Sequence, residues 1–155
     1  MRLWDWAVAA YGAPGVSDAC LALQDSHEQN APLLLWAGWT ASIGWRPDAE
    51  DIEGACDIAR AWDEAAAAPL RAIRRTLKGP HPDMDEGARE AVRNQVKAVE
   101  LEAERRLLEA LEALAPASPG GSVRPALDAM VEVARVWSRV TPRPALTRLA
   151  EALPA

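Results

Sequence analysis

The chain has 155 residues, of which 50% are hydrophobic and 26% charged, the balance of an ordinary globular protein with one domain over residues 1–155. Its net charge of −6 argues against a nucleic-acid binder, because such proteins gain most of their affinity by neutralising phosphates. Two cysteines without paired spacing argue against a disulfide framework.

Two helices are predicted before residue 30. The first spans Arg2–Tyr11, and a Gly- and Pro-containing stretch, Gly12–Gly15, ends it. Ser17 or Asp18 is expected to cap the second, which runs to Gln24, and 25–29 is expected to be a polar loop. The N-terminus lacks the long apolar core of a signal peptide, so we expect a cytoplasmic protein.

The uncharged stretch Leu33–Ile43 is predicted to be the central helix. Its large side chains point in every direction around a helix, which is typical of a fully buried one. Asn30 can cap its start, Pro32 fits its first turn, and Gly44 can end it. At about 1.5 Å per residue it is too short to span a bilayer, so we expect no membrane span.

A fourth helix is expected to begin at Asp48, with Asp51 three residues later. Pro69 interrupts its pattern, which predicts either a kink or a new short helix from Pro69 to Lys78.

The longest predicted helix covers Asp85–Ala115 and is expected to wrap the central helix. Apolar residues recur along it at helical spacing, at Ala88, Val92, Val96, Val99, Ala103, Leu107, Ala110 and Leu114. Leu101 and Leu108 lie outside this stripe, among charged residues. Either another helix of the chain covers this pair, or it contacts a partner or a second copy.

A flexible loop over Pro116–Ser122 and two further helices, Val123–Val140 and one ending near Leu153, complete the prediction. No Val/Ile/Thr-rich alternating run predicts a strand. The expected fold is an all-α bundle of seven or eight helices around Leu33–Ile43.

The first third of the chain resembles a bacterial family, the domain-of-unknown-function family 2390. The resemblance covers about residues 3–40 and rests on these segments: Leu3-Trp4-Asp5-Trp6-Ala7 with Tyr11, Pro14-Gly15-Val16, Ala19-Cys20-Leu21-Ala22-Leu23-Gln24-Asp25, His27, Leu33-Leu34-Leu35 and Trp39. It implies a small helical bacterial protein of the cytoplasm, without an assigned activity.

The sequence offers one candidate surface for a partner. Arg71, Arg74, Arg75 and Lys78 recur at helical spacing, so they share one flank of a helix. This flank can bind an anion or an acidic partner, or it can be a short basic amphipathic helix that touches a membrane. It can also simply place cations at a helix C-terminus, where the helix dipole favours them. With the Leu101 and Leu108 pair, it forms the predicted partner or anion site.

A pocket in the Trp-rich first third is the alternative site. Its candidate lining is aromatic and polar, and consists of Trp4, Asp5, Tyr11, Gln24, Asp25 and Trp39. Core packing is the competing explanation for these Trp residues. Neither of the two His residues stands in a metal-ligand spacing, and Cys20 lies on an apolar helix face, so no metal, cofactor or catalytic residue is predicted.

We therefore expect a non-enzymatic interaction or adaptor protein that binds a specific protein partner and is itself a monomer or weak homodimer. The alternative is a small-molecule-binding or enzymatic site in the N-terminal third.

Overall fold

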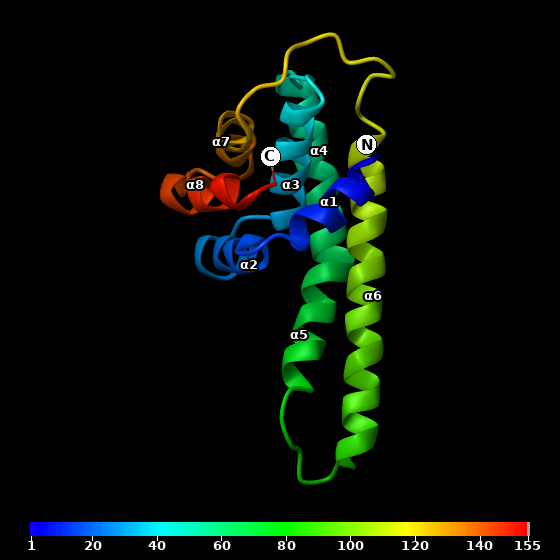
Figure 1. Ribbon diagram of the computed structural model, residues 1–155. Helices are drawn as coiled ribbons and strands as arrows, with labels where there is room; N and C mark the ends of the chain where they lie inside the picture. The colour runs from blue at the N-terminus through cyan, green and yellow to red at the C-terminus, as the bar shows by residue number, and fades with distance from the viewer. Residues whose placement is uncertain (155) are drawn as a thin grey trace.

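The computed structural model describes residues 1–154, and these residues form helices without any strand (Figure 1). The predicted all-α bundle is therefore confirmed. The described residues form eight α-helices and one short π-helical segment: α1 Leu3–Tyr11, α2 Val16–His27, α3 Ala31–Ser42, α4 Ala49–Trp62, η1 Asp63–Ala67, α5 Ala68–Thr76, α6 Glu86–Glu112, α7 Ala126–Trp137 and α8 Arg143–Ala152.

Helix α3 is the central helix, as the sequence predicts. Ten of its 12 residues are buried, and α1, α2, α4, α6 and α7 all pack against it. The Asn30 side chain accepts a hydrogen bond from the Leu33 amide at 3.0 Å, which caps the helix as expected. Gly44 follows with a φ of +74°, in the left-handed region that glycine adopts without steric cost.

The second helix differs from its prediction at both ends. It begins at Val16 after Gly15, and neither Ser17 nor Asp18 caps it. It then continues to His27, so the polar loop predicted for 25–29 was wrong for residues 25–27. Glu28 takes the left-handed conformation with a φ of +53°, and the Gln29 amide bonds the Leu23 carbonyl at 3.0 Å. The helix therefore has a normal C-terminal cap without a glycine to signal it.

Pro69 does not break the fourth helix, because a π-helical turn precedes it. Helices α4, η1 and α5 follow one another without a gap from Ala49 to Thr76. Pro69 has no amide hydrogen, and in a regular α-helix its ring collides with the carbonyl four residues earlier. The Ala68 amide bonds the Asp63 carbonyl, five residues back, so the wider turn relieves that collision.

Helix α6 wraps the central helix only with its C-terminal half. Its N-terminal half projects away from α3 beside α5, and the two helices form an antiparallel hairpin at one end of the molecule (Figure 1). The predicted inward stripe was therefore wrong along this half. Val92 and Val99 are each 52% exposed, because only α5 packs against the projecting half.

The loop predicted to be flexible is tied to the end of α3. The Gly121 amide bonds the Gly44 carbonyl at 3.0 Å, and the Arg124 amide bonds the Ala41 carbonyl at 3.2 Å. The next helix begins only at Ala126, because Pro125 occupies the position before its first turn. None of the helices in the described residues is long and apolar enough to cross a membrane.

Candidate functional site

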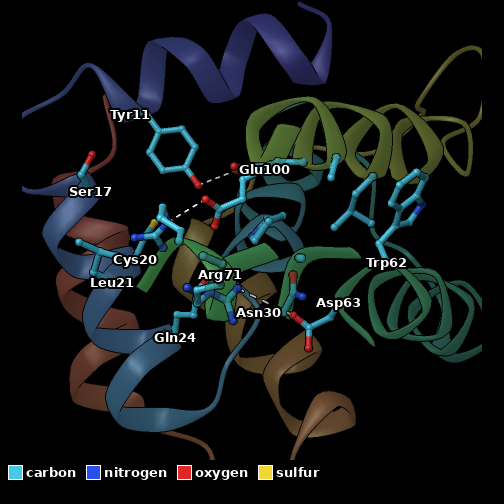
Figure 2. Close-up of a pocket in the computed structure, with 17 residues that line it drawn as sticks. Tyr11, Ser17, Cys20, Leu21, Gln24, Asn30, Trp62, Asp63, Arg71 and Glu100 are labelled. Atoms are coloured by element: carbon cyan, nitrogen blue, oxygen red, sulfur yellow. Dashed lines mark hydrogen bonds and ion pairs between the residues drawn. The ribbon is translucent and has the colours of Figure 1, made fainter. Parts of the chain in front are cut away.

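A pocket of about 330 Å³ opens between α1, α2, the start of α3, η1, α5 and α6 (Figure 2). This volume falls within the range of small-molecule sites. Tyr11, Cys20 and Gln24 line one side, and Trp62, Asp63 and Arg71 line the other. The π-helical turn before Pro69 supplies part of the wall, because Asp63 and Ala67 are its first and last residues.

The pocket holds charges of both signs. Arg74 donates to Glu100 at 2.7 Å, so these two residues form a short, hydrogen-bonded ion pair. Arg71 lies 3.9 Å from Asp63, beyond hydrogen-bond distance. Figure 2 shows Arg71 between Gln24 of α2 and Asp63 of η1. Its guanidinium has five N–H groups to donate, and none of them hydrogen-bonds a residue of 1–154.

Glu104 is the third carboxylate of the pocket, and it has no ion-pair partner among residues 1–154. It accepts a hydrogen bond from the Tyr11 hydroxyl at 2.7 Å. Burial raises the pKa of Glu104 above its ordinary value, and the Tyr11 hydrogen bond offsets part of this rise. Burial and the neighbouring Glu104 charge also raise the pKa of Tyr11 well above its usual range.

The Cys20 thiol lies on the same wall and is poorly suited to nucleophilic chemistry. Burial, with a smaller effect from Glu104, raises the pKa of this thiol to about 12. A thiol with so high a pKa carries almost no thiolate at neutral pH, and the thiolate is the reactive form.

The structure brings together residues from both predicted sites. Arg71 and Arg74 of the basic flank line the same pocket as Tyr11 and Gln24 of the Trp-rich alternative. Arg75 lies outside it and pairs with Asp25 at 3.0 Å, while Lys78 is exposed near the hairpin end. The flank is thus largely neutralised by carboxylates of this chain.

The other members of the Trp-rich set lie elsewhere. Trp39 is buried in α3, and its Nε1 donates to the Met1 carbonyl at 3.1 Å. Trp4 packs against the core with the Arg105 guanidinium 5.4 Å from its ring centre, and Asp5 is exposed on α1. Sequence reasoning missed Glu100 and Glu104, whose spacing on a helix resembles that of ordinary surface acids.

Leu101 and Leu108 occupy opposite environments. Leu108 is fully buried in the main core, so other helices of the same chain cover it. Leu101 is 56% exposed, just past the middle of α6. Only Leu101 of this pair is accessible to a partner.

The hairpin has a second surface, which we call the outer face. On α5 and α6 it consists of Pro69, Ile73, Thr76, Ala88, Val92, Gln95 and Val99, all of them exposed. At 100° per residue, Ile73 lies on the side of Leu70 opposite to Arg71, and Val92 and Val99 are rotated from Glu100 in the same sense. Because the helices are antiparallel, both rotations lead to the side of the hairpin away from the pocket.

Hydrogen bonds between the helices hold the hairpin together. The buried Arg89 side chain of α6 donates to the Leu77 carbonyl at 2.6 Å, which caps the end of α5. Arg93 donates to the Arg74 carbonyl at 3.3 Å. Arg89 also pairs with Glu90 at 2.7 Å, so its buried charge is compensated.

The family model described as "Protein of unknown function (DUF2390)" matches residues 2–111, from α1 almost to the end of α6. The match therefore includes every residue that lines the pocket and every residue of the outer face. Neither the curated proteins nor the solved structures give a match to the chain. Because the family model spans well over half of the 155 residues, the chain belongs to the DUF2390 family of proteins of unknown function.

Proposed function

We propose that this chain is a non-enzymatic adaptor of the bacterial cytoplasm, and that its outer face binds an amphipathic helix of a protein partner. The observation that carries the proposal is the composition of that face. Ile73, Val92 and Val99 are each about half exposed, and no charged residue belongs to the face. Two packed helices that leave such a face open can complete their packing by adding a third helix.

The opposite side of the hairpin supports this choice of surface. Charged residues of α5 and α6 concentrate there, and Arg74 and Arg75 are already paired with Glu100 and Asp25. A partner on that side would have to displace internal ion pairs. A partner on the outer face displaces no ion pair and covers mainly apolar side chains, beside the uncharged Thr76 and Gln95. Burying apolar area is worth about 25 cal/mol per Å².

The location in the cytoplasm is part of the same proposal. Cys20 and Cys56 are both buried and free, which suits a reducing compartment.

A photo-crosslinking amino acid at Val92, in the native cell, tests the proposal. The matched control is the same amino acid at Val8, another helical valine that is 52% exposed but belongs to α1. We expect a discrete adduct with one protein from position 92 and not from position 8. The purified partner should then bind the wild type and the Val8→Glu variant, and fail to bind Val99→Glu.

Two results would overturn the proposal. The first is the same set of adducts from positions 92 and 8, which would show that the outer face has no dedicated partner. An adduct between two copies of this chain, with a dimeric mass in light scattering, would make the face a self-association surface. A reversal of Arg71, Arg74 and Arg75 to Glu is a poor test, because it would also break three ion pairs of the fold.

A further inference from the structure

Two charged groups of the pocket, the Glu104 carboxylate and the Arg71 guanidinium, have no partner of opposite charge within hydrogen-bond distance among the described residues. Five charged side chains line it: Asp63, Arg71, Arg74, Glu100 and Glu104. The Arg74 and Glu100 pair at 2.7 Å is complete by itself. Of the remaining three, Arg71 and Asp63 are 3.9 Å apart, and Glu104 has the Tyr11 hydroxyl as its partner.

Glu104 is the group that a cation would satisfy. A carboxylate drawn out of water is normally matched by a positive charge, and a hydroxyl supplies only a neutral hydrogen bond. The two arginines of the pocket face other carboxylates, at Glu100 and Asp63. A ligand ammonium beside Glu104 would supply the missing positive charge. The Tyr11 hydroxyl donates to Oε1, so Oε2 is left to accept from the ammonium.

Arg71 is the group that an oxyanion would satisfy. Its planar guanidinium presents donors in a fork that matches a carboxylate or a phosphate. It stands inside the pocket between Gln24 and Asp63, and its distance to Asp63 leaves its N–H groups without a short acceptor (Figure 2). Gln24 and Asn30 on the same walls add amide groups that can bond the ligand.

Apolar side chains complete the lining. Leu21, Trp62, Ala67, Ala103 and Leu107 give the pocket an apolar wall suited to methylene groups. A volume of about 330 Å³ accommodates a molecule of amino-acid size and excludes a large cofactor.

From these contacts we infer that the pocket binds a small zwitterion, with a primary ammonium beside Glu104 and an oxyanion, carboxylate or phosphate, on Arg71. This inference is independent of the partner proposed for the outer face, which lies on the other side of the hairpin.

Isothermal titration calorimetry with matched probes tests the inference on the wild-type chain. The zwitterions are the ω-amino acids from β-alanine to 6-aminohexanoate, and the alkanoates and alkylamines of the same lengths each lack one charge. O-phosphoethanolamine distinguishes a phosphate from a carboxylate as the oxyanion. We expect at least one zwitterion to bind about ten-fold or more tightly than the alkanoate and the alkylamine of its length.

Two pairs of variants assign the ends of the ligand. Glu104→Gln keeps the acceptor for Tyr11 and removes the charge, and Arg71→Gln removes the cation. Each should weaken binding of the best zwitterion by about ten-fold or more. Glu102→Gln and Arg75→Gln are their controls on the same helices, because neither residue lines the pocket, and they should leave the affinity unchanged.

The wild-type titrations can overturn the inference without any variant. It fails if none of the zwitterions binds, or if an alkanoate or an alkylamine binds as tightly as the zwitterion of its length. It also fails if Glu104→Gln and Arg71→Gln, shown by circular dichroism to be folded, bind the zwitterion as the wild type does.

Discussion

Shortening Leu108 should destabilise the protein far more than shortening Leu101, although both leucines belong to helix α6. Leu108 is 0% exposed within the main core, whereas Leu101, two turns earlier on the same helix, is 56% exposed. Since the two positions share one helix and one residue type, the helix propensities of Leu and Ala cancel in the comparison. The difference between the variants therefore measures burial.

The magnitude follows from the atoms removed. Leu→Ala deletes about three carbon groups, each worth about 0.8 kcal/mol when fully buried, and the cavity left behind adds to this loss. We expect Leu108→Ala to lower the free energy of unfolding by about 3–5 kcal/mol. Leu101→Ala should change it by less than about 0.5 kcal/mol, because its side chain is mostly in water already.

Urea unfolding followed by tryptophan fluorescence and by far-UV circular dichroism measures both changes. For a chain of this length, the expected loss in Leu108→Ala corresponds to a fall in Tm of roughly 6–20 °C. Equal and small effects at the two positions would refute the burial of Leu108. An effect of Leu101→Ala as large as that of Leu108→Ala would show that the hairpin is covered in solution.

Three further predictions concern the core, a cap and the pocket. Trp39→Asp places an unpaired charge in the buried central helix and should cost more than about 4 kcal/mol, so a soluble, cooperatively unfolding variant would contradict the central position of α3. Asp48→Ala removes the capping box with Asp51, in which each side chain accepts from the other residue's amide, and should cost about 1 kcal/mol in urea unfolding. Burial raises the pKa of Glu104, so at a pH between the unfolded and the folded pKa the folded chain keeps a proton that the unfolded chain has released. The stability from this group is therefore complete below about pH 4 and is lost as the pH rises through the folded pKa. Glu104→Gln, which stays neutral, should therefore gain stability relative to wild type as the pH rises above about 4. A difference that does not change with pH would contradict the raised pKa.

Capping residues next to apolar periodic runs correctly predicted where α3 and α4 begin. Asn30 and Asp48 were identified as caps because their short polar side chains precede apolar periodic runs, and both accept the expected amide hydrogen bonds. The end of α2 was missed because Glu28 adopts the left-handed conformation, which glycine would have signalled. At Pro69 the sequence left a kink and a new short helix as alternatives, because the π-helical turn that joins α4 to α5 has no simple sequence pattern.

The pocket was predictable only in pieces. Arg71 and Arg74 share a helix flank, and Tyr11 and Gln24 belong to a Trp-rich segment, but these segments are about 50 residues apart in the chain. Glu100 and Glu104 looked like solvated acids, because a single helix carries no information about which of its sides another helix will cover. Their role depends on the packing of α1, α2 and α5 against α6.

The sequence by itself determined the all-α class and the burial of most of Leu33–Ile43, of which residues 33–41 are buried. Hydrophobic periodicity and an uncharged run both act within one segment. The tertiary structure alone decided that half of α6 projects with α5 beyond the core, that Leu108 is buried while Leu101 is exposed, and that Glu104 meets Tyr11. Those outcomes depend on which helices pack together. Apolar spacing along one helix shows which side of it can be buried. Whether that side is buried depends on which other helices lie beside it at each point along its length.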